Sequence, residues 1–256
     1  MTELLVSVGV LSVSVLLAEA LRRAAARLPR GSPGTYLLEA ACTFQVCCCS
    51  HELKLLGDAR QLELPASLGL TFAVTLVHLL SFRGASCNPC GVLEGFCRGT
   101  RSPRAAALLI ACQFAAALAA RQFAASVWAL GLSGLHVRHR RFGFRCFEPL
   151  GGTVLEAAAM ELGCAFVMQA AAINELRAPC VAAVVTLLVY TGGGISGAFF
   201  NPVLAFSVQF PCSGHTYLEY CFVYWLGPVL GVSSCVLLVE KIVPFLSGTA
   251  QKPKTQ

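Results

Sequence analysis

Charged side chains are scarce in this chain of 256 residues, where Asp, Glu, Lys and Arg together make up only 12%. A soluble globular domain carries about 25% charged and roughly 45–50% apolar residues, whereas apolar residues reach 56% here. Nineteen basic and thirteen acidic side chains are too few to cover the surface of a soluble protein of this size. With a mean hydropathy of +0.70, the composition excludes soluble and disordered folds and predicts an integral protein of the lipid bilayer.

Several chemical signatures are also missing from the sequence. Basic patches interleaved with aromatic residues do not occur, which excludes a nucleic-acid partner. The sequence holds neither a nucleotide-binding loop nor a catalytic triad, so we expect no enzyme and no cofactor. His51 and His78 show no consistent spacing to cysteines, so we expect no zinc or other metal site. An Asn-x-Ser/Thr acceptor is absent too, so glycosylation gives no indication of the compartment.

The net charge of +6 is modest, and the positions of the basic residues are more informative than their total. Arginines gather between apolar runs, where charges set the orientation of membrane helices. The arginines within 22–30 predict that the C-terminal end of the preceding apolar run lies in the cytosol. The basic segment 138–145 then falls on the lumenal side, against the usual distribution of positive charge.

Seven apolar runs are long enough to cross a membrane as helices of about 17–25 residues. They cover residues 4–21, 35–55, 65–83, 104–131, 151–173, 178–194 and 217–245. Two further apolar stretches, 88–97 and 201–210, are too short to span, and each begins with Asn-Pro after a segment rich in Gly, Ala and Ser. Such segments at matching places in two halves of a chain indicate half-helices that line a transport pathway.

The two halves carry matching landmarks in the same order. A Glu-x-x-Cys-x-Phe motif begins at Glu39 in the first half and at Glu161 in the second. A Gly-Ala-x-x-Asn-Pro motif follows it in each half. Three apolar runs accompany each copy, and an odd number of spans per repeat forces the second copy to be inserted upside down. We therefore predict an all-α membrane fold built on an inverted repeat. The predicted divisions are an N-terminal extension (1–34), the first repeat (35–131), a connecting loop (132–150), the second repeat (151–245) and a C-terminal tail (246–256).

Two half-helices that enter from opposite sides can meet with their N-termini facing each other. Each N-terminus carries about half a positive charge from its peptide dipoles, which repels cations. Asn88 and Asn201 would cap these helices, with side-chain amides that can donate hydrogen bonds into a narrow pore. We expect Glu39 and Glu161 to be structural acceptors for backbone amides of the re-entrant loops. The pattern predicts a passive channel for water and small neutral solutes.

At these residues the chain resembles the aquaporin (major intrinsic protein) family. The matching positions are the twin Asn-Pro-Ala signatures at Asn88-Pro89-Cys90 and Asn201-Pro202-Val203, the glutamates Glu39 and Glu161, Gln113, and the aromatic-Gly-Pro run at 224–228. Asn-Pro-Cys as the first signature, together with Cys212 after the second, is similar to the unorthodox branch of this family.

The resemblance implies a specific architecture and a set of solutes. It implies six transmembrane helices plus two re-entrant half-helices, to which the run 4–21 adds an extra N-terminal helix. It also implies a homotetramer in an intracellular membrane, notably the endoplasmic reticulum. The implied solutes are water, glycerol and hydrogen peroxide.

The chain departs from the common family pattern at the signatures and at the filter. Both signatures lose their alanine, to Cys90 and Val203. Leu204 stands where most of the family has an arginine. The other filter positions fall at Leu68, Val189 and Ala198, so the predicted constriction is apolar. An arginine would oppose cations, and its absence leaves an ion channel as an alternative function.

Fourteen cysteines are interpreted mainly as small, polarisable packing residues, because most of them lie inside apolar runs. Cys87 and Cys90 form a C-x-x-C spacing, which can be redox-active at a helix N-terminus, so a redox-regulated membrane protein is a second alternative. Cys146 and Cys212 fall in loops on the same non-cytosolic side if the aquaporin topology holds. An oxidising lumen would allow a disulfide between them.

Overall fold

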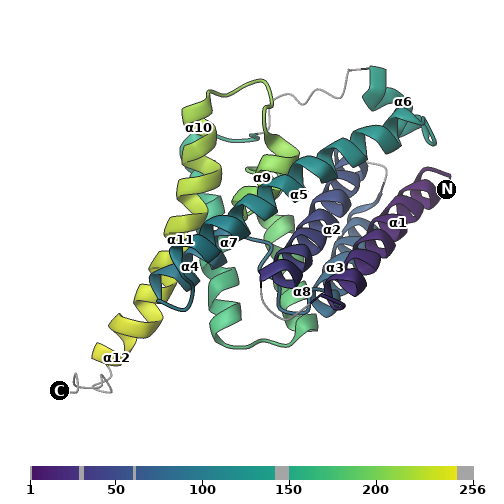
Figure 1. The fold of residues 1–256 in the computed structure, drawn as a ribbon. Coiled ribbons are helices and arrows are strands. Elements are labelled where there is room, and N and C mark those ends of the chain that lie inside the picture. The colour runs from purple at the N-terminus through teal and green to yellow at the C-terminus, as the bar shows by residue number, and fades with distance from the viewer. Residues whose placement is uncertain (1, 29–31, 60–61, 142–149, 247–256) are drawn as a thin grey trace.

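The computed structural model describes residues 2–28, 32–59, 62–141 and 150–246, which form helices joined by short connections, without a strand (Figure 1). The long helices are α1 (Thr2–Ala25), α2 (Ser32–Asp58), α3 (Leu64–Ser81), α5 (Pro103–Ala129), α7 (Val154–Ile173) and α8 (Ala178–Gly192). The short ones are α4 (Pro89–Cys97), α6 (Gly134–Arg141) and α9 (Pro202–Gln209). The last segment comprises α10 (Tyr217–Cys221), η1 (Phe222–Leu226), α11 (Gly227–Leu237), η2 (Leu238–Ile242) and α12 (Val243–Leu246).

Most of the long helical segments match a membrane span in length and composition. Five described segments are long and apolar enough to cross a bilayer: Glu3–Ala25, Leu64–Ser81, Pro103–Ala129, Val154–Ile173 and Tyr217–Glu240. α8 is a shorter apolar helix of 15 residues. The 27 residues of α2 give it a length of about 40 Å, enough to cross a hydrocarbon core of about 30 Å. The predicted all-α membrane fold is confirmed.

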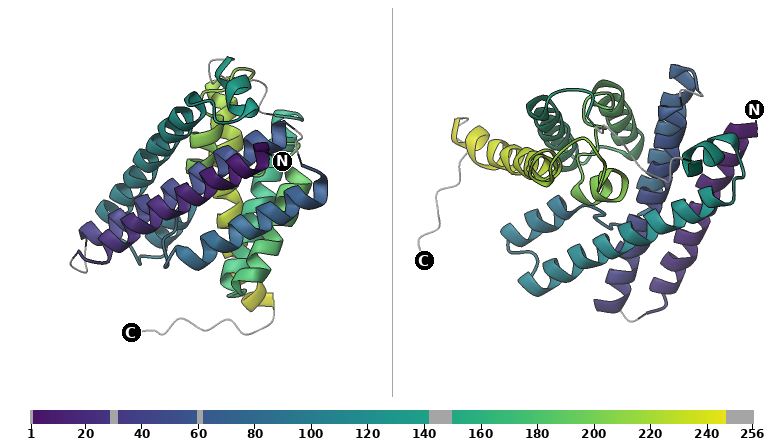
Figure 2. Two further views of the ribbon diagram at one scale, coloured as in Figure 1. Left: turned by 90° about the vertical axis from the view of Figure 1, so that its right-hand side faces the viewer. Right: turned by 90° about the horizontal axis from the view of Figure 1, so that it is seen from above.

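The helices assemble as two groups that lie side by side when the molecule is seen from above (Figure 2). In the first group α2 packs along α5, and in the second α7 packs along α11. α3 packs against α8, and the two short helices α4 and α9 also contact each other, so the groups are joined at both places. The short helices therefore lie where the two halves of the chain meet.

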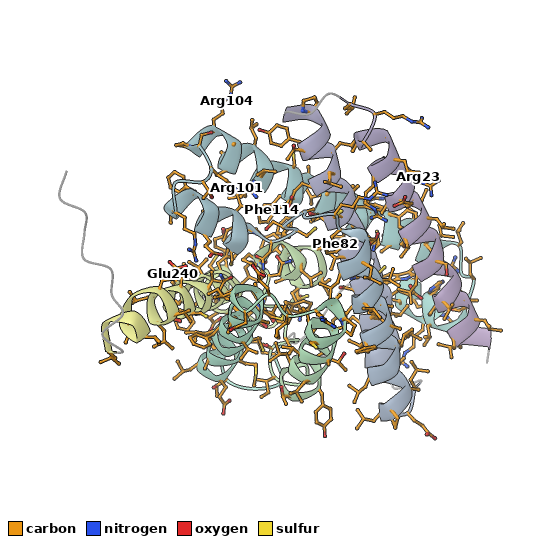
Figure 3. The ribbon with its side chains drawn as sticks, turned by 90° about the horizontal axis from the view of Figure 1, so that it is seen from below. Arg23, Phe82, Arg101, Arg104, Phe114 and Glu240 are labelled. Carbon is orange, nitrogen blue, oxygen red and sulfur yellow. The ribbon has the colours of Figure 1, made fainter. Side chains whose placement is uncertain are left out.

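Aromatic side chains reinforce this junction between the halves. The ring of Phe114 on α5 stacks on that of Trp225 in η1, with centroids 5.4 Å apart, and lies near the middle of the bundle in Figure 3. Phe206 of α9 meets Phe114 edge-on at 5.0 Å. Phe114, Trp225 and Phe206 thus form one aromatic cluster that joins the two halves of the chain and a half-helix, and their ring geometries are favourable ones.

Glycine allows the close approach of α7 and α11. A Cβ atom placed on Gly231 of α11 would lie 2.3 Å from the carbonyl oxygen of Leu162 and 2.9 Å from the Cβ of Ala165, both on α7. Small residues of this kind let the backbones of two membrane helices come into contact. The resulting van der Waals packing stabilises helix association in lipid, where the hydrophobic effect does not.

Helix α1 lies outside the repeat and flanks α2 at the periphery of the bundle (Figure 1). Buried polar contacts attach it at both ends: Ser7 donates to the Glu52 carboxylate over 2.5 Å, and Arg22 donates to the Gln45 side chain over 2.6 Å. α2 itself begins at Ser32, three residues before the predicted run. The extra N-terminal helix is therefore an integral part of the bundle.

Two local features differ from the sequence prediction. The predicted connecting loop contains helix α6, whose first amides, those of Gly134 and Leu135, donate to the Glu3 carboxylate of α1. The predicted run 217–245 is interrupted by two π-helical turns. At the first, the amide of Gly227 donates to the Phe222 carbonyl, and the adjacent Pro228 explains why: proline lacks an N–H and its ring crowds the preceding turn.

Candidate functional site

Helices α4 and α9 have the length and the start signals of half-helices. With nine and eight residues they are about 12–14 Å long, less than half of a bilayer core. Each has an asparagine at the N-cap and a proline at the first helical position, where the missing N–H costs no helical hydrogen bond. Asn88 and Asn201 share a φ of −146°, so the two starts have the same backbone conformation.

The two asparagines cap their own helices through their side-chain oxygens. The Oδ1 atom of Asn88 accepts a hydrogen bond from the amide of Cys90 at 2.9 Å, and that of Asn201 accepts from Val203 at 3.1 Å. Each cap satisfies one of the amides that a helix N-terminus leaves without an intrahelical partner. The third residue of each signature thus provides a capped backbone amide, while its side chain, Cys90 or Val203, is buried.

The side-chain amides of the two asparagines link the half-helices reciprocally. The Nδ2 atom of Asn88 donates to the carbonyl of Phe200 at 3.3 Å, and that of Asn201 donates to the carbonyl of Cys87 at 2.7 Å. Each acceptor is the residue just before the other asparagine. This pair of hydrogen bonds relates the two helix starts by an approximate twofold symmetry.

The residue before each asparagine adopts a left-handed backbone conformation, with a φ of 51° at Cys87 and 38° at Phe200. This conformation costs a non-glycine residue about 1–3 kcal/mol. A buried carboxylate offsets that cost in both halves: Cys87 donates its amide to Glu39 at 2.6 Å, and Phe200 donates its amide to Glu161 at 2.5 Å. Hydrogen bonds to a charged acceptor contribute about 1.5–3 kcal/mol.

Each glutamate is held by further donors. Glu39 also accepts from the amide of Ser86 at 3.1 Å and from the Gln113 side chain at 2.7 Å. Glu161 also accepts from the Ser196 hydroxyl at 2.6 Å and from the amide of Phe199 at 2.9 Å. Both carboxylates are buried and therefore fix the shape of the re-entrant loops from inside the protein.

Sequence reasoning missed the serines of these loops. The Ser86 hydroxyl donates to the Asn88 carbonyl at 2.9 Å, and Ser196 donates to Glu161 while its own carbonyl accepts from the Tyr224 hydroxyl at 2.7 Å. A small hydroxyl residue shortly before each Asn-Pro, in a glycine-rich context, was the available signal. The aromatic-Gly-Pro run thus contributes Tyr224 to the support of the second loop.

The four predicted filter residues lie on four different elements. Leu68 is near the start of α3 and Val189 is near the end of α8, two helices that pack on each other. Ala198 is buried in the loop before α9, and the partly buried Leu204 lies in the first turn of α9. Leu204 packs against clusters from both halves of the chain. Their arrangement as a ring stays a prediction.

Most of the free cysteines in the described residues are buried, and one further cysteine is cross-linked. Cys90 packs with Ala165 and Val232, in line with its interpretation as a packing residue. Cys212 is disulfide-bonded. Its predicted partner, Cys146, lies outside the described residues, so the pairing itself stays a prediction. A search of the described residues for groups of His, Cys, Asp and Glu that could hold a metal ion finds none.

Comparison with known proteins decides the family. The chain is 37% identical to aquaporin-11 of Homo sapiens over 244 residues, which cover 92% of this chain and 89% of the relative. It is 34% identical to aquaporin-12 of Mus musculus over 257 residues, or 96% of this chain and 89% of the relative. The chain belongs to the aquaporin family. No protein-family model matches it, and the aquaporin-11 of the tardigrade Milnesium tardigradum shares 25% identity over 226 residues.

These relatives confirm the resemblance that the sequence predicts, including the unorthodox branch. The aquaporin is therefore a multi-pass membrane protein of a family of channels. The inverted pair of half-helices and the two buried glutamates are the parts of its structure that a channel function can use.

Proposed function

We propose that this aquaporin forms a passive pore for water and small neutral solutes, including glycerol and hydrogen peroxide, where the N-termini of α4 and α9 meet. The observation that carries the proposal is the reciprocal pair of hydrogen bonds from Asn88 and Asn201. These bonds hold the two side-chain amides and the two helix N-termini close together. A buried carboxylate supports the loop that leads into each helix.

The paired amides suit a neutral permeant that carries an oxygen atom. An asparagine side chain has two N–H donors, and the observed bonds to the opposite loop use one of them in each case. The second donor can bind the oxygen of a passing molecule. A water molecule oriented in this way does not accept protons along the file, and the positive ends of the two helix dipoles oppose cations.

The composition of the filter positions supports a broader solute range than water alone. Leu68, Val189, Ala198 and Leu204 offer no side-chain hydrogen bonds to replace those that water loses on leaving bulk solvent. A narrow apolar ring also favours dewetting. We therefore propose that water passes slowly and that glycerol and hydrogen peroxide are disfavoured less than in a pore lined by arginine.

We propose that the protein is a homotetramer of the endoplasmic reticulum membrane with the end of α1 that carries Arg22 and Arg23 in the cytosol. The connection from α9 to α10, to which Cys212 belongs, lies at the upper end of the molecule in Figure 1, whereas the C-terminal end of α1 lies toward the lower side. A disulfide at Cys212 supports an oxidising compartment such as a lumen for that upper end.

The direct test is flux through the purified protein in proteoliposomes. Stopped-flow light scattering measures water and glycerol, and an encapsulated peroxide-sensitive dye measures hydrogen peroxide. We expect all three fluxes to exceed those of protein-free vesicles, with a high ratio of glycerol to water. Ionic current without any excess solute flux would contradict the proposal and favour an ion channel.

Aspartate variants of the two asparagines test the position of the pore. Asn88→Asp and Asn201→Asp keep the oxygen that caps the helix and remove the amide that faces the opposite loop. We expect each variant to lower solute flux by about tenfold or more, since a lost donor at a charged or polar site is worth roughly 1.5 kcal/mol or more. Asn174→Asp is the matched control, because Asn174 is exposed and donates only within its own helix end, to Ala170. Equal flux in all three variants would refute the placement of the pore.

A further inference from the structure

Two arginines, Arg101 and Arg104, lie where the connection after α4 leads into α5. Arg101 precedes the first residue of α5, Pro103, by two positions, and Arg104 lies in the first turn of that helix. The segment that begins at Pro103 is long and apolar enough to cross a bilayer, so both arginines lie at its boundary. Seen from below, the Arg104 side chain extends away from the bundle (Figure 3).

This arginine pair lies on the side of the molecule where α1 ends. The neighbouring Arg98 forms an ion pair with Glu240 of η2, and η2 leads into α12 at the lower end of the molecule in Figure 1. The C-terminal end of α1 also lies toward the lower side. In the orientation proposed above, the arginine pair therefore faces the cytosolic leaflet, where anionic lipids give the membrane a negative surface charge.

The three arginines of this segment differ in how their charges are balanced. Arg98 donates to Glu94 at 2.8 Å and also pairs with Glu240. Within the described part of the chain, neither Arg101 nor Arg104 forms an ion pair or a side-chain hydrogen bond. The first turn of α5 contains no acidic residue either. Two neighbouring guanidinium groups are thus available to an anion from outside the protein.

The side chain of Arg101 is held against the last turns of α4. A Cβ atom placed on Gly95 would lie 3.0 Å from the Arg101 Nε atom and 3.1 Å from its Cδ atom, so this side chain crosses α4 where residue 95 has none. The Gly95 carbonyl accepts from the amides of Thr100 at 2.9 Å and Arg101 at 3.2 Å, which folds the connection back onto the helix. Because Arg101 is already partly buried, it loses less conformational freedom on binding than a free side chain.

Exposed apolar side chains lie next to the arginine pair. Phe96 in the last turn of α4 is 41% exposed, and Leu108 of α5 is 40% exposed. Leu108 follows Arg104 by four residues and therefore lies on the same face of α5, one turn further into the span. Cations at the boundary followed by apolar side chains inside it match a ligand with a charged head and apolar chains.

We propose that Arg101 and Arg104 bind the headgroup of an anionic phospholipid such as phosphatidylserine, whose acyl chains lie along Phe96 and Leu108. A guanidinium group presents donors in a planar fork that matches the oxygens of phosphate and carboxylate groups. Phosphatidylserine carries both groups and a net negative charge. The binding does not depend on the proposed pore, and only the assignment of the leaflet rests on the proposed orientation.

Native mass spectrometry of the full-length protein in detergent tests this site. Dissociation constants are compared for the first bound molecule of phosphatidylserine and of phosphatidylcholine, which has no net charge, with identical acyl chains. A basic side chain beside an anionic lipid contributes about fivefold in affinity, so we expect phosphatidylserine to bind about tenfold more tightly or better. Equal affinities for the two lipids would overturn the proposal. The measurement needs neither flux nor a defined orientation, so this outcome is distinct from a failure of the proposed pore.

A double variant and a matched control assign the preference to the arginine pair. Arg101→Gln combined with Arg104→Gln should abolish the preference and leave the binding of phosphatidylcholine unchanged. Arg23→Gln is the control and should keep the preference, because Arg23 is exposed on the same side but already pairs with Glu19 at 2.9 Å. A preference that survives in the double variant, or that the control loses to the same extent, would refute the assignment.

Glycerophosphoserine distinguishes a lipid site from a site for free anions. It has the headgroup of phosphatidylserine without acyl chains and so lacks the contacts with Phe96 and Leu108. Each methylene group that is buried contributes about fourfold in affinity, so we expect glycerophosphoserine to bind at least about tenfold more weakly than phosphatidylserine. Equal affinity for the two compounds would show that the site takes free anions and would contradict a lipid ligand.

Discussion

Replacing Glu161 by glutamine should destabilise the protein through the loop that leads into α9. One carboxylate oxygen accepts from Ser196 and Phe199 and the other accepts from the amide of Phe200. Glutamine keeps one oxygen and presents an NH₂ group to the second site, so one charge-assisted bond, worth about 1.5–3 kcal/mol, is lost. The orphaned amide costs about 1–3 kcal/mol more.

The removal of a buried charge acts in the opposite direction. Glu161 is 0% exposed, and a neutral side chain is less costly to bury than a carboxylate. Because the carboxylate already accepts three hydrogen bonds, this gain offsets only part of the loss. We expect Glu161→Gln to lower the free energy of unfolding by about 2–4 kcal/mol.

Unfolding in mixed detergent micelles, followed by tryptophan fluorescence, measures this change. Trp225 belongs to η1, which packs against α7, and only two tryptophans contribute to the signal. Glu175→Gln is the control, since Glu175 is exposed and surface substitutions usually change stability by less than about 0.5 kcal/mol. If Glu161→Gln is as stable as this control, the loop is not held by the carboxylate and the reasoning is wrong.

Two further substitutions address helix packing and the filter. Gly231→Ala should lower the free energy of unfolding by about 2–3 kcal/mol, because the new Cβ would lie 2.3 Å from the Leu162 carbonyl oxygen. The control is Gly163→Ala, whose new Cβ has no heavy atom within 4 Å and which should be neutral or stabilising in the same unfolding assay. Leu204→Arg should lower the ratio of glycerol to water permeability relative to Leu204→Met, because the guanidinium narrows the ring and supplies donors to water. A ratio equal to or above that of the unchanged protein would refute the filter assignment.

The elements that the sequence predicts well are those whose signals are local. The half-helix expected at 88–97 is observed as Pro89–Cys97, and the one expected at 201–210 as Pro202–Gln209, because an asparagine cap followed by proline marks a helix start within two residues. The glutamates could be singled out because Glu39 and Glu161 occupy corresponding places in the two halves. In a chain with an internal repeat, each half thus indicates which residues of the other half are structurally important.

Features that depend on contacts between distant residues could not be predicted. Helix α6 begins where Glu3 accepts two of its amides, and these partners are more than 130 residues apart in the sequence.

Buried carboxylates explain how an apolar chain specifies one arrangement of its helices. Lipid is as apolar as leucine, so burial of leucine side chains distinguishes poorly between possible helix neighbours in a membrane. A carboxylate needs several donors in defined directions, and an unsatisfied one is costly away from water. Glu52 of α2 illustrates the result, since it accepts from Ser7 of α1 at 2.5 Å and from Trp128 of α5 at 2.8 Å, with the His136 ring of α6 at 3.3 Å.

Buried glutamates join distant elements in this way at three places in the bundle. Glu52 joins α1, α5 and α6 to α2, Glu39 joins α2 to the first re-entrant loop, and Glu161 joins α7 to the second. Each acceptor draws its donors from elements that are distant in sequence, and few other neighbours could satisfy it. The few acidic residues that a membrane chain can tolerate are therefore placed where helix packing alone would leave the arrangement undetermined, and two of the three lie directly behind the asparagines of the proposed pore.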